Sequence, residues 1–166
     1  MSLIQNAALL SLNYTVLSSS CYAENYLPSY ALNYSNSGFM SQNIPGSYWQ
    51  INFSKPVEIS SYLICPSTNT GYRPMSWNIT SSMDGRFWRL NENHNNEQWP
   101  SAPQNKTINF KRAVICKMLR ITLVKNYGST NILCFNYFDC FGTLWFPDPT
   151  KRERNVQRFR SIMARQ

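Results

Sequence analysis

The side chains that could carry out catalysis are few in this sequence: one histidine, five cysteines and eight carboxylates in 166 residues. His94 stands in an Asn-rich stretch without a serine-nucleophile motif or a cysteine partner, so we expect an exposed turn residue rather than a general base. Glu92 and Glu97 fall in the same polar stretch and Asp84 in a turn, which does not suit a pair of catalytic carboxylates. No nucleotide-binding fingerprint occurs. The sequence therefore predicts no catalytic residues, no cofactor and no enzyme.

The cysteines are scattered along the chain and their number is odd. They are Cys21, Cys65, Cys116, Cys134 and Cys140. The last two are separated by five residues, which is not the Cys-x-x-Cys spacing of a zinc site, so no metal is predicted. An odd count without a recognisable signal peptide favours reduced thiols that serve as small core residues in a cytosolic compartment.

Targeting signals are weak. A short apolar run at residues 7–10 lacks the preceding positive charge and the following cleavage site of a secretory signal. No run approaches the roughly 18 apolar residues that a membrane span needs. Asn-x-Ser/Thr sequons begin at Asn13, Asn33, Asn52, Asn78 and Asn105, but several arise by chance in a chain this rich in Asn and Ser. We expect a cytoplasmic location, with an extracellular one as the alternative.

The remaining composition indicates strands rather than helices. Charged residues make up only 14% of the chain, and Asn, Ser, Thr and Tyr, which favour strands and turns, supply most of the polarity. Short β-rich segments bounded by turn formers predict strands at residues 48–53, 57–65, 76–83, 87–90, 106–110, 115–124 and 132–144. About seven or eight such strands predict an all-β sandwich or jelly roll over residues 1–145.

Five residues have specific predicted places in this fold. Asp84-Gly85 predicts a two-residue hairpin turn with a positive φ at the glycine. Trp77 and Trp88, on either side of that turn, are candidate anchors of the core because each indole can bury a large apolar area. Arg120 lies in an apolar strand and needs a carboxylate or carbonyl partner if it points inward.

The end of the chain departs from the strand pattern. Residues 146–166 begin with a Pro-rich linker, after which Thr150 and Glu153 form a capping box and predict a basic amphipathic helix. The apolar face of this helix is Val156, Phe159, Ile162 and Met163, and its basic residues are Lys151, Arg152, Arg154, Arg158, Arg160 and Arg165. Residues 151–166 hold +5 of the total net charge of +8. It suits an acidic partner or is a solvated end, and its apolar face could dock on the sandwich, on another protein or on a membrane surface.

Three blocks of residues follow one another in a recognisable order. They are residues 48–53 (Tyr-Trp-Gln-Ile-Asn-Phe), 74–79 (Pro-Met-Ser-Trp-Asn-Ile) and 81–88 (Ser-Ser-Met-Asp-Gly-Arg-Phe-Trp). This series resembles the discoidin domain, also called the coagulation-factor type C domain, and its galactose-binding-like relatives. Weaker matches extend the resemblance over residues 14–144. It implies a discoidin-like jelly-roll β-sandwich, and it indicates the fold more strongly than the ligand.

The chain departs from the family pattern in three places. Residues 31–34 read Ala-Leu-Asn-Tyr where family members often carry Ala-Leu-Asp-Gly beside a calcium site, and the missing carboxylate argues against calcium. Cys21 and Cys140 lie near the ends that a disulfide joins in secreted members, but the missing signal peptide argues against that bond here. His94 does not belong to a copy of the His, Arg and Asn set that galactose-binding relatives use.

The resemblance also implies that ligands meet loops at one end of the sandwich. The candidate residues are Tyr22, Tyr26, Tyr72, Arg73, Asn126 and Tyr127. Tyr72-Arg73 is the first choice, because an aromatic ring beside a guanidinium suits a sugar, a carboxylate or a protein hot spot. Phe39-Met40 lies in another of these loops and is expected to be core.

Two functions follow from these observations. The first is a non-catalytic intracellular module of a larger assembly, cytoskeletal, ciliary or microtubule-associated, whose protein partner has an acidic surface such as that of tubulin. The alternative is a carbohydrate-binding, lectin-like module of an extracellular or cell-surface protein. Neither function predicts a nucleic-acid partner, and a membrane surface is the weakest of the predicted partners.

Overall fold

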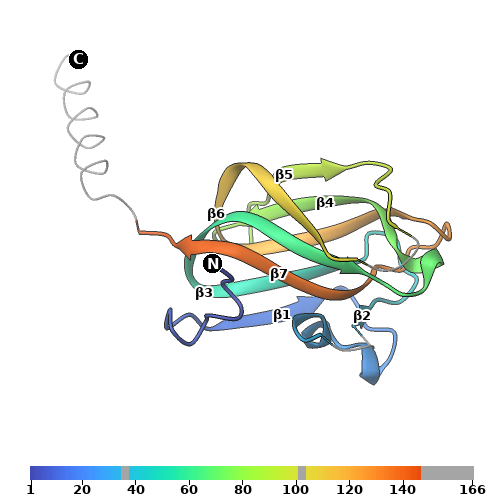
Figure 1. The fold of residues 1–166 in the computed structure, drawn as a ribbon, viewed down its shortest axis with the longest axis horizontal. Coiled ribbons are helices and arrows are strands. Elements are labelled where there is room, and N and C mark those ends of the chain that lie inside the picture. The colour runs from blue at the N-terminus through green and yellow to red at the C-terminus, as the bar shows by residue number, and fades with distance from the viewer. Residues whose placement is uncertain (35–37, 101–103, 147–166) are drawn as a thin grey trace, which may run out of the picture.

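The computed structural model describes residues 1–34, 38–100 and 104–146, and these form a jelly-roll β-sandwich (Figure 1). Its strands are β1 (Tyr14–Ser18), β2 (Phe39–Met40), β3 (Tyr48–Pro66), β4 (Pro74–Ser82), β5 (Arg89–His94), β6 (Lys106–Asn126) and β7 (Cys134–Leu144). Three short 3-10 helices, η1 (Glu24–Tyr26), η2 (Pro28–Leu32) and η3 (Thr70–Tyr72), lie in the loops. The hydrogen-bonded strand order is β2-β7-β3-β6-β4-β5, with β1 paired to β3. The predicted all-β fold is confirmed.

The long strands β3 and β6 belong to both layers of the sandwich. The first part of β3 pairs with the second part of β6, as at Tyr48 and Thr122, and its second part pairs with the first part of β6, as at Ile64 and Lys106. The prediction of four separate strands here is therefore wrong. Pro56 lies within the register shift between Asn52 and Val57, where a residue without an N–H is tolerated, so the chain bends without ending the strand.

The core is built from large aromatic side chains in the space between the layers. Trp49, Tyr62 and Trp77 are fully buried, and Trp49 lies 4.8 Å from the ring of Phe138. The indole N–H of Trp49 donates to the carbonyl of Pro28 (2.9 Å), and that of Trp77 donates to the hydroxyl of Tyr62 (3.1 Å). Each buried polar atom of these rings thus has a partner, as a dry core requires.

Other predicted core residues are also in place. Phe39 and Met40 are buried in β2, which confirms the prediction for that pair. Cys65, Cys116, Cys134 and Cys140 are buried free thiols, whereas Cys21 is partly exposed and also free. The two cysteines near the ends of the domain, Cys21 and Cys140, are therefore not joined by a disulfide in this structure.

The turn after β4 is wider than predicted. Strand pairing stops at Ser81 and Arg89, so the connection is a loop rather than a two-residue hairpin. Gly85 has the expected positive φ of +76°, and the carboxylate of Asp84 accepts hydrogen bonds from the backbone N–H groups of Arg86 (2.9 Å) and Phe87 (3.0 Å). This local network replaces the strand pairing that residues 87 and 88 were expected to form.

The prediction that Trp88 anchors the core is also wrong. This residue is only half-buried and lies on the outer face, where its ring stacks on the guanidinium of Arg120 at 3.9 Å. The ring of Tyr48 lies at 4.2 Å from the same guanidinium, and the side-chain carbonyl of Gln50 accepts from Nε of Arg120 at 2.9 Å. The predicted need of Arg120 for a partner is met by an amide carbonyl and two aromatic rings.

The predicted basic tail lies outside the described residues. Its helix, its apolar face and its six basic residues therefore stay predictions, as does a domain boundary at residue 145. Within the ranges that the structure describes, no helix is long and apolar enough to cross a membrane.

Candidate functional site

Several of the predicted ligand loops meet at one end of the sandwich. Tyr26 and Tyr72, from loops far apart in the sequence, both pack against a small cluster formed by Met40, Ile132 and Cys134. The turn around η3 is joined to the 126–132 loop by a hydrogen bond from the N–H of residue 128 to the carbonyl of residue 71 (2.7 Å). The tertiary fold thus brings these loops together at one end, as the resemblance implied.

Exposed aromatic rings mark this loop end. Tyr22 is 59% exposed and Tyr127 is 40% exposed. The ring of Tyr22 meets that of Tyr26 edge to face, with centroids 5.9 Å apart. Exposed rings that are already held by neighbours lose little conformational freedom on binding, so they suit recognition of a ligand with apolar faces.

A small pocket of about 200 Å³ opens beside the ring of Tyr127. Its walls come from Thr70, Arg73, Trp99, Pro100 and Tyr127. The indole N–H of Trp99 donates to the carbonyl of Pro74 (2.7 Å), and the hydroxyl of Tyr127 donates to the carbonyl of Glu97 (2.7 Å). Both aromatic walls are therefore fixed by hydrogen bonds to backbone. Sequence reasoning missed Trp99, because its neighbours Gln98 and Pro100 indicated only a turn.

Arg73 does not present its guanidinium to solvent as predicted. The side chain is only 4% exposed, and it donates to the backbone carbonyls of Ser67 (2.8 Å), Pro100 (2.8 Å) and Thr68 (3.5 Å). A guanidinium has five donors in a fixed fork, which here ties two loops together. Arg73 shapes the wall of the pocket rather than offering a free cation.

Asn126 is the second predicted contact residue that turns out to be internal. It is completely buried. Its amide N–H donates to Thr130 Oγ1 (2.7 Å) and to the carbonyl of Ile132 (3.0 Å), and its amide oxygen accepts from the N–H of Thr130 (2.9 Å). The side chain therefore closes the loop that carries Tyr127, and a ligand does not reach it.

His94 is not an exposed turn residue. It ends β5, its side chain is 13% exposed, and its ring stacks on Trp77 with centroids 4.6 Å apart. Nε2 lies 3.0 Å from both the hydroxyl of Tyr62 and the carboxylate of Glu92, and Nδ1 lies 3.1 Å from Glu97. The reason is the register of β5, which pairs His94 with the inward-pointing Trp77.

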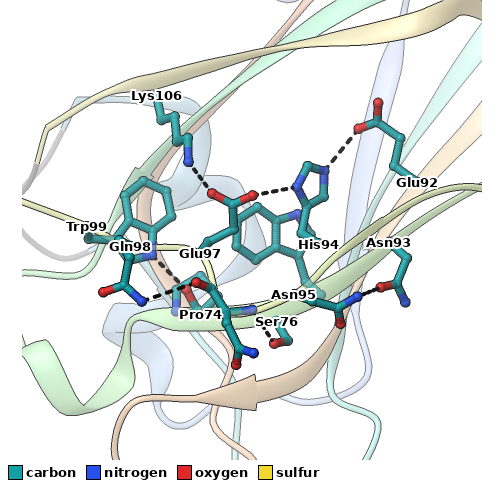
Figure 2. Close-up of polar contacts among 12 residues, drawn as sticks. Pro74, Ser76, Glu92, Asn93, His94, Asn95, Glu97, Gln98, Trp99 and Lys106 are labelled. Carbon is teal, nitrogen blue, oxygen red and sulfur yellow. Dashed lines mark hydrogen bonds and ion pairs between the residues drawn. The ribbon is translucent and has the colours of Figure 1, made fainter.

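Figure 2 shows that Lys106, Glu97, His94 and Glu92 form a continuous polar chain beside the loop end. Burial by itself would raise the pKa of Glu97. The hydrogen bonds from Lys106 and His94 and the charges of both residues lower it by more, so the pKa lies below its usual value. The chain holds the 95–99 segment, and with it Trp99, against β4. Among the described residues, no group of three or more His, Cys, Asp and Glu is arranged to hold a metal ion.

The family is decided by comparison with known domains. The model of the F5/8 type C domain matches residues 15–135. This chain belongs to the F5/8 type C domain family. No curated protein sequence matches the chain.

Solved structures give the same fold at low sequence identity. The CBM32-5 module from Clostridium perfringens, in complex with GalNAc-β-1,3-galactose, is 14% identical, covers 86% of this chain and 100% of its own, and has a TM-score of 0.69. The family 32 module of NanJ from C. perfringens, in complex with galactose, is 18% identical, covers 84% and 96%, and has a TM-score of 0.63. A fucolectin from striped bass (Morone saxatilis) serum is 15% identical, covers 82% and 48%, and has a TM-score of 0.65.

Domains of this F5/8 type C family are non-catalytic binding modules, and the described sandwich is one of them. The same comparisons offer no support for a cytoskeletal or ciliary assembly.

Proposed function

We propose that this F5/8 type C domain is a carbohydrate-binding module whose glycan lies at the loop end, with one sugar ring in the pocket between Trp99 and Tyr127. The observation that carries the proposal is that pocket, with two fixed aromatic walls at the end of the sandwich where the loops gather. Its volume of about 200 Å³ is below that of the usual pocket for a drug-sized ligand, roughly 300 to 1,000 Å³, and therefore suits a single ring.

The chemistry of the pocket matches the two surfaces of a pyranose. The C–H face of the sugar can stack on the exposed ring of Tyr127, and hydroxyl groups at the sugar edge can bond to the hydroxyl of Thr70 and to backbone groups of the same turn. Tyr26 and Tyr72 pack on one cluster at the same loop end, and Tyr22 meets Tyr26 edge to face. We expect these rings to contact a second or third sugar unit.

The solved neighbours support this choice over an intracellular scaffold. Two of them are complexes with galactose-containing sugars, and a further family 32 module, of AlyQ, is in complex with 4,5-unsaturated mannuronic acid. An extracellular or cell-surface location accompanies this function. The sugar itself is not inherited from relatives that share fewer than one residue in five with this chain.

A glycan array followed by titration calorimetry on the best ligand tests the proposal. Tyr127→Ala should weaken binding at least tenfold because it removes the stacking surface, whereas Tyr127→Phe keeps the ring and should retain most of the affinity. Tyr72→Ala should weaken oligosaccharides more than single sugars. Phe87→Ala is the matched control, because Phe87 is 81% exposed on the loop between β4 and β5; its affinity should stay within twofold. An array without any bound glycan, or binding that survives Tyr127→Ala, would show that the proposal is wrong.

A further inference from the structure

A second cavity lies on the flank of the sandwich and takes no part in the loop-end site. It has a volume of about 470 Å³ and is lined by residues 89–92 of β5, residues 110–115 of β6 and Ser81. β5 is at one rim of the molecule in Figure 1, and β6 bends towards it. The lining therefore consists of two consecutive stretches of strand that face each other, which gives the cavity the form of a trough.

Both strands reach this trough with an unpaired edge. β5 pairs only with β4. Residues 106–109 and 114–116 of β6 pair with β3, residues 110–113 lie in the register shift between these two stretches, and pairing of β6 with β4 begins only at Met118. Apart from these strand pairings, residues 89–92 and 110–115 form no backbone-to-backbone hydrogen bond with another described residue. Each edge therefore offers N–H and C=O groups to an added strand.

The charge of the trough is positive. Arg89, Lys111 and Arg112 line it and are exposed. None of the three forms an ion pair with a described residue. The one carboxylate in the lining, Glu92, is already within 3.0 Å of His94. An anionic occupant would therefore meet three basic side chains with no internal competitor.

The trough also has apolar surface. Leu90 is 56% exposed and Ile115 is 42% exposed, whereas Phe110 and Val114 are nearly buried beneath them. Side chains of a strand alternate between its two faces, so a segment that alternates acidic and apolar residues could place its carboxylates near the basic rim and its apolar groups on this surface.

We infer that this trough is a second binding site, which takes an extended acidic peptide segment as an added strand along the free edge of β5 or β6. Four to six residues of such a segment span about 13 to 20 Å at roughly 3.3 Å per residue, in keeping with the length of the two lining stretches. The C-terminal residues 151–166 of this chain carry a net charge of +5, so charge argues against this tail as the occupant. The site is separate from the glycan pocket and does not depend on it.

Fluorescence anisotropy with a labelled, capped hexapeptide of alternating glutamate and valine tests the inference on the full chain. Saturable binding is expected, and it should weaken as salt is added. Lys111→Glu combined with Arg112→Glu should weaken it at least tenfold. Lys125→Glu is the control, because it reverses one charge at an exposed site on the far end of β6. It should change the affinity for the peptide less than twofold.

Two further probes separate an added strand from simple charge attraction. The same peptide with alternate backbone amides N-methylated cannot donate to a strand edge and should bind at least tenfold more weakly. A sulfated oligosaccharide should not displace the peptide at equal concentration. If no peptide binds, the basic side chains act only to keep these edges from pairing, and the inference is overturned; equal binding of the methylated peptide, or preference for the sulfated sugar, overturns it too. Glycan binding by the Lys111 and Arg112 variants should remain intact.

Discussion

The guanidinium of Arg73 stabilises the loop end by donating hydrogen bonds to backbone carbonyls of two loops. Three backbone carbonyls from the turn before η3 and from Pro100 surround its guanidinium, and each of them would lose a charged donor if the side chain were shortened. The residue therefore stabilises the loop end on which the proposed glycan pocket depends, although it is not free to bind a ligand by its full fork.

Replacing Arg73 should therefore affect stability first. Arg73→Ala removes the charged donor from the carbonyls of Ser67, Thr68 and Pro100 and leaves a cavity where a buried side chain stood. We expect the free energy of unfolding to fall by about 2 to 4 kcal/mol. Urea denaturation followed by tryptophan fluorescence measures this. Arg89→Ala removes an exposed arginine and is the matched control, with an expected change within about 0.5 kcal/mol. Equal stability of the two variants would contradict the role given to Arg73.

The five cysteines differ in how far water can reach them. Burial raises the pKa of Cys134 to about 11 and of Cys116 to about 12, and raises that of Cys140 well above its usual value. Because the thiolate is the reactive form, buried thiols are protected both by access and by protonation. Cys21 is the partly exposed one, with its sulfur 3.6 Å from the hydroxyl of Ser18.

We accordingly expect alkylation to be selective. Iodoacetamide at pH 8 should modify Cys21 in the folded protein, while the four buried cysteines should react only after denaturant is added. Peptide mass spectrometry identifies the modified positions. Rapid native labelling of Cys116 or Cys140 would show that the sandwich opens more easily than its packing indicates.

At the scale of elements, the pairing of β3 with β7 depends on one glycine. Gly142 lies opposite Ile59. A Cβ added there would stand 1.9 Å from the carbonyl oxygen of Glu58 and 3.0 Å from the Cα of Ile59. These are backbone atoms, so no side-chain rotation relieves the contact, and the two strands would have to separate.

Gly142→Ala should therefore be strongly destabilising although it adds one methyl group. We expect a loss of about 3 kcal/mol or more, measured by thermal unfolding with circular dichroism. Gly71→Ala is the control, since the nearest atom to its added Cβ is a flexible side-chain oxygen of Asn69 at 3.5 Å, and its loss should stay below about 1 kcal/mol. Similar melting temperatures for the two variants would refute the close approach of β3 and β7.

At the scale of the whole molecule, the polar chain of Figure 2 joins the segment after β5 to the start of β6. Glu97 accepts from Lys106 and lies beside His94, and its backbone N–H donates to the carbonyl of Met75 on β4 (2.8 Å). The segment that carries Trp99 is thereby fastened to both strands. Its attachment should weaken in acid, because Glu97 must be ionised to hold its partners.

The pH dependence has a definite sign. The pKa of Glu97 is lower in the folded chain than its ordinary value of 4.5, so its contribution to stability is present above about pH 4.5 and is lost as the pH falls through the folded value. The difference in unfolding free energy between the natural chain and Glu97→Gln should be constant from about pH 6 to 7 and should shrink below about pH 4.5. Denaturation series at several pH values measure it, with Glu24→Gln, at an exposed carboxylate, as the control. A difference that grows in acid would contradict this assignment.

Much of the fold could be read from local residue patterns. The alternation of residues 48–53, the Asp84-Gly85 turn and the indole of Trp77 indicated strands, a reversal and a core, because period-two patterning and turn chemistry are local properties of the chain. The order of these segments also resembled that of the discoidin domain and so indicated the family. The same patterns also suggested the wrong division of β3, since a proline that would interrupt a regular ladder is accommodated at a bulge. The division of β6 was wrong because residues 110–113 lie in a register shift that does not end the strand.

Local residue patterns were enough to place this chain among the discoidin-type sandwiches and to name its aromatic loop residues other than Trp99. The packing of the chain was needed to show that Arg73 and Asn126 point inward and that His94 lies on Trp77. It was also needed to find the pocket between Trp99 and Tyr127 and the trough between β5 and β6. The reason is that most of these outcomes depend on contacts between segments that are distant in the sequence, such as that of Arg73 with Pro100, or on the register between strands, such as the pairing of His94 with Trp77. Neither is encoded in a short stretch of sequence.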